Sequence, residues 1–139
     1  MQQAFTTIEV TTQGQGLFEI SDRLCGWVSG SGIGDGLLTI FIRHTSASLV
    51  IQENADPDVQ RDLETFLERV VPEDSRLYRH TAEGDDDMPA HIRAALTATQ
   101  LSIPVRGGRP RLGTWQGVYV FEHRRGRFRR SVDLHLIGD

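Results

Sequence analysis

Three of the five histidines lie where an imidazole could bind a metal ion or move a proton. His44 ends an apolar, strand-like segment, His80 lies in a polar connection, and His91 follows the predicted start of a helix. The positive end of a helix dipole disfavours imidazolium, so His91 should stay neutral, the form that binds metals or accepts protons. Spacing alone is a weak metal signature, because no two of these histidines stand four residues apart on one helix. A histidine hydrogen-bonded at a turn is the alternative for each position.

Carboxylates stand close to these histidines in the chain. The acidic run of residues 83–87 separates two of them, and Asp87 suits a helix cap or a hydrogen-bond partner of a ligand histidine. Glu53 stands at a strand-to-helix junction, where functional side chains often lie, and is the candidate general base. Asp62 lies at the edge of the apolar stripe of a predicted helix, where its charge needs a partner such as an arginine or a ligand histidine.

Two later segments could contact a ligand. Residues 113–117 read Gly-Thr-Trp-Gln-Gly, and the glycines around Gln116 permit close approach of the backbone to a strand or a ligand, with strand packing favoured. Residues 123–130 form a predicted hairpin with five arginines. A solvated turn explains Arg124, Arg125 and Arg127. Arg129 and Arg130 enter the next strand and could present a guanidinium fork to phosphate.

Two segments have helical periodicity. The first is capped by Asp56, begins at Pro57 and continues to about residue 70, before Pro72. The second follows Asp87. The predicted inward stripes are Val59, Leu63, Phe66, Leu67 and Val70 in the first helix and Ile92, Ala95, Leu96 and Thr99 in the second.

Strand patterns dominate the remainder of the chain. In residues 132–136 polar and apolar residues alternate, which predicts that Val132, Leu134 and Leu136 face the core and that His135 faces away. The order of strands, helix, loop, helix and strands predicts an α+β fold with mostly antiparallel pairing and both helices on one side of the sheet. The predicted strands are residues 5–11, 17–20, 37–43, 47–52, 100–105, 115–122 and 129–137.

Composition excludes several classes of function. The 139 residues suit one domain, residues 1–139. A lone Cys25 rules out an internal disulfide and a cysteine zinc site. All fifteen basic residues are arginines, so no lysine Schiff base or phosphate-loop lysine exists. A net charge of −4 argues against nucleic-acid binding, and the absence of a long apolar run or signal sequence predicts a cytoplasmic protein away from membranes.

The motifs in residues 44–48, 53–57, 83–92 and 113–117 have the order and spacing found in the YjbQ-like family, which the chain resembles over nearly its whole length. Members of that family are described as secondary thiamine-phosphate synthases without an established physiological role. The resemblance implies a compact α+β fold, a homotrimer and a pocket containing the family's histidines, onto which His44, His80 and His91 fall. Other motif positions are matched by Glu53, Asp62, Gln116 and Arg130.

Two functions from different classes follow. As an enzyme, the protein would join a hydroxymethylpyrimidine diphosphate to a thiazole phosphate, with a divalent metal, zinc by expectation, held by His44, His80 and His91. Glu53 would move a proton, aided by Asp62 and Gln116, and Ser46 and Arg130 would hold phosphate. The alternative is a trimeric binding module that captures a phosphorylated metabolite or a metal without turnover.

Overall fold

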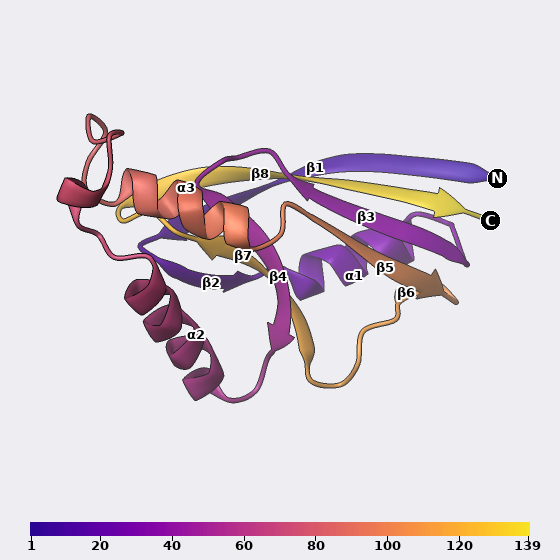
Figure 1. Ribbon diagram of the computed structural model, residues 1–139. Coiled ribbons are helices and arrows are strands. Elements are labelled where there is room, and N and C mark those ends of the chain that lie inside the picture. Colours follow the sequence, from indigo (N-terminus) through magenta and orange to yellow (C-terminus); the bar gives the residue numbers. More distant parts are fainter.

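The computed structural model describes residues 1–139 as one α+β domain of eight strands, three α-helices and one short 3-10 helix (Figure 1). All strand pairs are antiparallel, which confirms the predicted class. The strands are β1 (Gln2–Gln13), β2 (Gly16–Glu19), β3 (Gly36–Ile42), β4 (Ala47–Glu53), β5 (Gln100–Arg106), β6 (Arg109–Pro110), β7 (Gln116–Glu122) and β8 (Arg127–Gly138). The helices are α1 (Ser21–Gly30), α2 (Pro57–Val70), η1 (Ser75–Leu77) and α3 (Asp87–Leu96).

The strands form two sheets. The larger has the order β1-β8-β3-β5-β6, and the smaller has the order β2-β7-β4. The predicted alternation in β8 is confirmed, since Val132, Leu134 and Leu136 are fully buried and His135 is only half-buried. The core lies between the sheets and α1, whose Leu24 and Val28 are fully buried.

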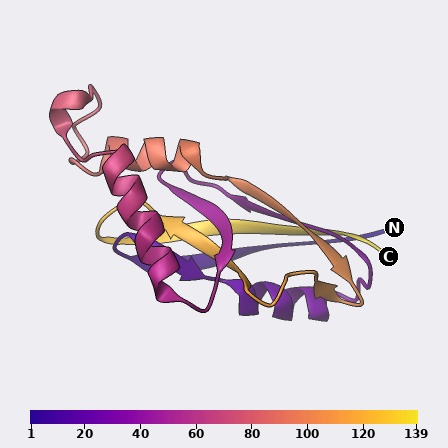
Figure 2. The ribbon, with the colours of Figure 1, turned by 60° about the horizontal axis from the view of Figure 1, so that its bottom comes forward.

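Helix α1 was absent from the sequence prediction. It contains two glycines, begins after Ile20 without a side-chain cap, and buries only Leu24 and Val28, so its local signals are weak. The two predicted helices lie together at one end of the molecule, whereas α1 lies along the sheets at a distance from them (Figures 1 and 2).

The predicted inward stripe is confirmed in part for α2 and is largely wrong for α3. In α2 Leu67 is buried and Val59 and Leu63 are half-buried, whereas Phe66 and Val70 are 60% and 54% exposed. In α3 the predicted Leu96 is 63% exposed, because the helix packs through a neighbouring face. That buried face consists of Asp87, Pro89, Ala90, Arg93 and Ala94.

Candidate functional site

A cluster of two imidazoles and one carboxylate lies at the start of α3. Asp87 is the first residue of this helix and His91 lies one turn later, so both side chains are on one face. His80 approaches from the connection that follows η1. Asp87 Oδ2 lies 2.6 Å from His80 Nε2 and 3.2 Å from His91 Nε2, and one candidate ligand atom from each of the three residues lies within 4.8 Å of the others.

The tautomer of His91 follows from its backbone contact. Its Nδ1 lies 2.8 Å from the carbonyl oxygen of Thr45, an acceptor, so Nδ1 carries a proton. In the neutral ring, Nε2 then presents a lone pair towards the Asp87 carboxylate. Two electron-rich atoms facing each other need a cation between them or a proton. Histidines that bind metals characteristically donate their other ring N–H to a carbonyl or carboxylate in this way.

Asp87 is 2% exposed, and Arg124 pairs with Oδ1, the carboxylate oxygen that does not contact the histidines. Arg124 Nη1 lies 2.9 Å from Asp87 Oδ1, and Arg124 Nε donates to Asp86 Oδ2 at 2.9 Å. Burial alone would raise the pKa of Asp87, but the His80 hydrogen bond and the charges of Arg124 and His91 outweigh it and lower that pKa. The carboxylate is therefore ionised, as a metal ligand must be.

These donors fit a divalent cation. Two imidazole nitrogens and one carboxylate oxygen form the ligand set that zinc and non-haem iron enzymes use while leaving positions for substrate. The imidazoles reach solvent, since the side chains of His80 and His91 are 44% and 30% exposed. Because the ligand set is small and accessible, it suits a catalytic rather than a closed structural site.

A shallow hollow of about 280 Å³ adjoins this cluster on the side of His91. Its walls come from the β3–β4 connection, the last turns of α3 and the residues that follow that helix, and they are mainly apolar. Ligand pockets often combine such apolar walls with a few polar groups. The lining residues are His44, Thr45, His91, Ala94, Ala95 and Thr99.

His44 borders the hollow but does not join the cluster. Its Nε2 accepts the backbone N–H of Ser131 at 2.8 Å, and its Nδ1 lies 3.5 Å from Arg130 Nη1. Burial first, and then the charge of Arg130, lower the pKa of His44. Both ring nitrogens thus face donors within the chain, and His44 lies outside the cluster formed by His80, Asp87 and His91.

The residues predicted to hold phosphate belong to a buried network. Arg130 is 4% exposed and pairs with Glu122, which accepts from Arg130 Nε at 2.7 Å. Arg130 Nη2 donates to Ser46 Oγ at 3.1 Å, and its guanidinium lies over the Phe128 ring. Thr12 donates to the same Glu122 carboxylate. This arrangement favours an internal ion pair for Arg130 over the predicted phosphate contact.

The three predicted catalytic residues lie apart from the histidines within one chain. Glu53 and Gln116 are paired at the far end of β4 and β7, about 20 Å from the end that carries Ala47 at about 3.3 Å per strand residue. Glu53 Oε2 accepts the backbone N–H groups of Ala55 and Asp56, and it thereby stabilises the turn before α2. Asp62 is exposed on α2.

The sequence predicts Asp87 as a helix cap or as a partner of a histidine, and the second role is confirmed, since Asp87 Oδ2 contacts His80 and His91. A role as a direct metal ligand was not predicted, although the spacing of four residues before His91 is the helical relation that no pair of histidines shows. Arg124 was assigned to a solvated turn, yet its side chain is only 17% exposed. No local signal in residues 123–130 indicates that this arginine reaches across to α3.

Comparisons with known proteins agree over most of the chain. A family model described as "UPF0047 protein YjbQ-like" matches residues 6–139. A UPF0047 protein of Synechocystis is 54% identical over 130 residues, covering 94% of this chain and 88% of the relative. The YjbQ protein of Salmonella typhimurium is 43% identical over 119 residues, covering 85% of this chain and 86% of the relative.

Solved structures show the same fold. A conserved hypothetical protein of Thermus thermophilus superimposes with a TM-score of 0.85 at 34% identity, covering 95% of this chain and 99% of that one. A protein of Sulfolobus solfataricus described as of unknown function gives a TM-score of 0.86 at 25% identity, covering 99% of this chain and 100% of the other.

Proposed function

The chain belongs to the YjbQ-like UPF0047 family, and from this premise we propose that it is an enzyme for small phosphorylated substrates, with a divalent metal held by His80, Asp87 and His91. The observation that supports the proposal most directly is the His91 ring. Its Nδ1 faces the Thr45 carbonyl at 2.8 Å, and its Nε2 faces the Asp87 carboxylate at 3.2 Å. That orientation suits metal ligation better than an isolated hydrogen bond.

A bound divalent ion would supply Lewis-acid polarisation of a phosphoryl oxygen. The chain's own residues provide the rest. Arg124 fixes Asp87 by pairing with its second oxygen, and Thr45 fixes the plane of the His91 ring. The hollow beside His91 offers Ala94 and Ala95 to the apolar part of a substrate. A small heteroaromatic ring bearing a phosphate suits this combination of surfaces.

The specific reaction that we propose is the secondary thiamine-phosphate synthase reaction of the family. It joins a hydroxymethylpyrimidine diphosphate to a thiazole phosphate and releases pyrophosphate. Both substrates consist of a ring and a phosphoryl group, which corresponds to the apolar hollow next to the two histidines and Asp87. Glu53, the predicted proton carrier, lies at the other end of β4 in the same chain, so its participation requires a neighbouring copy.

The test is product formation by protein purified from a host that lacks its own thiamine-phosphate synthase. We expect metal-dependent product from the unmodified protein and loss of that product with Asp87→Asn. His135→Gln is the matched control, because His135 lies on β8 and contacts Gln3 instead of the cluster. Failure of the unmodified, metal-loaded protein to form product would refute this reaction, and equal activity of Asp87→Asn would refute the assigned site.

A non-catalytic binding module is the second candidate, and one observation favours it. Within one chain no unpaired carboxylate lies beside the hollow next to His91. Asp87 is paired with Arg124, and Glu53 accepts backbone N–H groups in the turn before α2. A binder would be stabilised against heat by a phosphorylated thiazole without forming product. An enzyme would lose turnover with Glu53→Gln while retaining that stabilisation.

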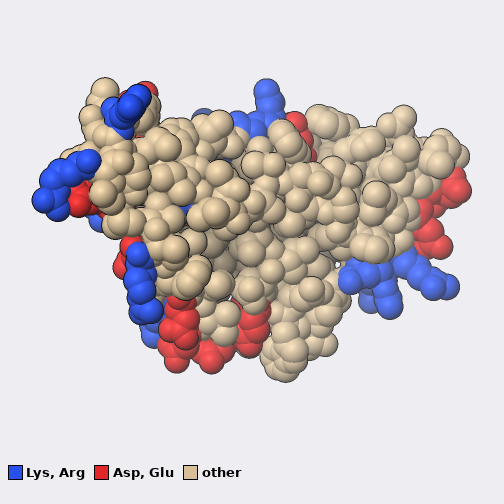
Figure 3. All heavy atoms as spheres, viewed as in Figure 1, with Lys and Arg blue, Asp and Glu red and all other residues tan.

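We also propose that the homotrimer expected from the family covers an apolar hollow between α2 and α3. Phe66, Val70 and Leu96 are 60%, 54% and 63% exposed, and they line a depression of about 460 Å³. Figure 3 shows few charged side chains on the face between these helices. Exposed apolar surface of this kind is typical of interfaces between protein chains.

A further inference from the structure

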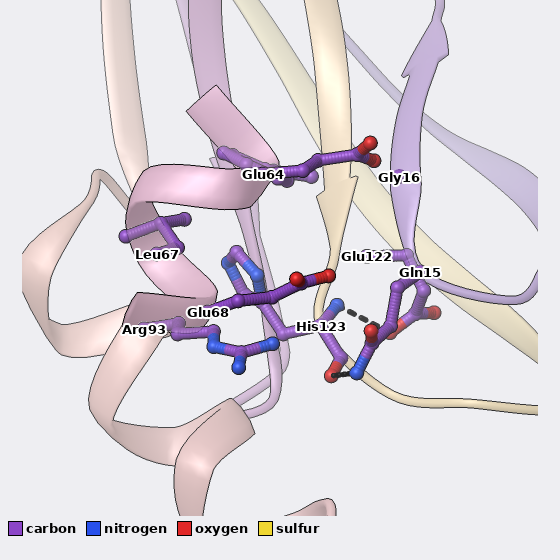
Figure 4. A pocket seen from close by; sticks show the side chains of 9 residues that line it. Gln15, Gly16, Glu64, Leu67, Glu68, Arg93, Glu122 and His123 are labelled. Carbon is purple, nitrogen blue, oxygen red and sulfur yellow. Dashed lines mark hydrogen bonds between the residues drawn. The ribbon is translucent and has the colours of Figure 1, made fainter. Parts of the chain in front are cut away.

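A third cavity lies between α2, α3 and the start of β2, and it is lined by charged groups of both signs. Its volume is about 130 Å³. Figure 4 shows Glu64 and Glu68 reaching from α2 towards the start of β2, with Arg93 entering from α3. The walls consist of Gln15, Gly16, Glu64, Leu67, Glu68, Arg93, Phe121, Glu122 and His123.

Arg93 is buried with too few acceptors. It is 4% exposed, yet its guanidinium makes one hydrogen bond, from Nη2 to the Val71 carbonyl at 2.9 Å. Its Nε has no acceptor, and Nη1 lies 4.0 Å from the nearest carboxylate oxygen, that of Glu73. Burying a guanidinium with unmet donors is unfavourable, so an acceptor inside the cavity that bonds to Nη1 would stabilise this side chain.

The opposite wall carries two carboxylates that have no ion-pair partner in the chain. Glu64 and Glu68 stand one helical turn apart on α2, and neither forms an ion pair. Burial, and then the charge of Glu68, raise the pKa of Glu64. Adding a Cβ at Gly16 would bring it within 3.1 Å of Glu64 Oε1, so the absence of a side chain there leaves room for the carboxylate.

His123 contributes no charge to this wall. It is 1% exposed, and burial followed by the charge of Arg93 lowers its pKa to about 4. Its Nε2 lies 2.9 Å from Ser48 Oγ, which fixes the ring. The cavity therefore offers the guanidinium of Arg93 from α3 and the carboxylates of Glu64 and Glu68 from α2, while the third lining carboxylate, Glu122, is already paired with Arg130.

We propose that this cavity binds a small zwitterion of the α-amino acid class, with its carboxylate on Arg93 and its ammonium group on Glu64 and Glu68. A plain anion would meet the two glutamates, and a plain cation would leave Arg93 without an acceptor. A molecule that carries both charges a few ångströms apart satisfies both walls. The cavity accepts only the smallest side chains, so glycine and alanine are the expected ligands. This site is separate from the proposed metal centre.

The test is a titration of the full-length protein followed by nuclear magnetic resonance, with the Arg93 Nε–H and the Gln15 side-chain amide as reporters. Glycine and alanine should shift both signals saturably, whereas acetate and methylamine should not. Glu68→Gln should weaken alanine binding about tenfold, because it removes one charge-assisted contact. Glu68 is exposed, so the variant should fold.

Asp62→Asn is the matched control, since Asp62 is exposed on the same helix outside the cavity, and alanine binding should not change. Acetate binding with the affinity of alanine would show an anion site instead, and methylamine binding alone would show a cation site. No saturable shift with any probe would mean that the cavity holds water only. Each of these three results would overturn the proposal.

Discussion

The His91 ring is held between the Thr45 carbonyl, 2.8 Å from Nδ1, and the Asp87 carboxylate, 3.2 Å from Nε2. Thr45 lies in the connection from β3 to β4, and Asp87 opens α3, so this contact ties the edge of the sheets to the helix that carries the cluster. It fixes the ring before any ligand binds. Preorganisation of this kind reduces the cost of assembling a metal site.

Metal affinity should depend on Asp87 and His91 and should not depend on His44. Replacing either with Ala removes a direct ligand, and we expect the zinc affinity to fall at least about 100-fold, the upper end of what loss of an outer partner costs. Elemental analysis after dialysis against limiting zinc measures this. His44→Ala is the control, because both ring nitrogens of His44 face donors in the chain. Equal loss of zinc in His44→Ala would restore the three-histidine ligand set.

Arg124→Gln should destabilise the metal-free protein by about 3 kcal/mol, because it leaves the carboxylates of Asp86 and Asp87 without their cation. Zinc should recover part of this loss, since the ion would neutralise Asp87. The increase in Tm on adding zinc should therefore be larger in Arg124→Gln than in the unmodified protein. Arg125→Gln is the matched control, because Arg125 pairs with Glu73. An unchanged zinc-induced increase would argue that Arg124 and the ion do not share Asp87.

The sequence predicts the helices and strands well where local signals are strong. Asp56 caps α2 by accepting from the Asp58 N–H, with Pro57 at the first helical position, as the sequence indicates. The sequence does not predict contacts between side chains that are far apart in the chain. The face of α3 that packs inward includes Arg93, which donates to the carbonyl oxygen of Val71 just after α2. No periodicity within α3 encodes that contact.

The candidate site was predictable in the same partial way. The sequence identifies His80 in a polar connection and His91 at a helix start as candidate site residues, and their side chains do lie together. His44 is grouped with them by residue type and by the match to the family's histidines. His44 differs from the other two histidines in its contact with the backbone N–H of Ser131. Strand β8 brings this group to His44 from 87 residues away. A contact over that separation needs the pairing of β3 with β8, which spacing does not reveal.

The free energy of unfolding should fall as the pH drops from about 6.5 to about 4. Folded His123 has its pKa lowered to about 4, whereas the unfolded residue titrates near 6.5, so within this window the unfolded chain binds the extra proton. The loss reaches about 3 kcal/mol, from about 2.5 pKa units at 1.36 kcal/mol each. The pKa of His44 is also lowered, so His44 contributes to the same loss of stability as the pH falls.

Urea titrations in EDTA at several pH values measure this dependence. His123→Gln should be less stable near pH 7.5 than the unmodified protein, because it loses the contact with Ser48, but its stability should change less between pH 6.5 and 4. His135→Gln, which alters a half-buried histidine on β8, should retain the full pH dependence. If His123→Gln keeps that dependence as well, the buried ring is not its source.

Replacing only Arg130 of the Glu122–Arg130 pair should lower the free energy of unfolding more than replacing both residues. Arg130→Met leaves a buried carboxylate without its cation and should destabilise the protein by about 3–5 kcal/mol, whereas Glu122→Leu combined with Arg130→Met should recover much of that loss. Chemical denaturation of the single and double variants measures the difference. A small effect of Arg130→Met on stability, together with weaker phosphate binding, would return Arg130 to the phosphate-binding role predicted from the sequence.

Phe66→Arg should disrupt the proposed homotrimer. Phe66 is 60% exposed beside Val70 and Leu96, and a guanidinium in a buried apolar interface would lack a partner. Light scattering coupled to size-exclusion chromatography should show three copies for the unmodified protein and a shift to one copy for the variant. Leu77→Arg is the control, because Leu77 is 61% exposed in η1 but does not line the hollow. A monomeric unmodified protein would remove the proposed trimer and, with it, any route for Glu53 to reach the histidines from a neighbouring copy.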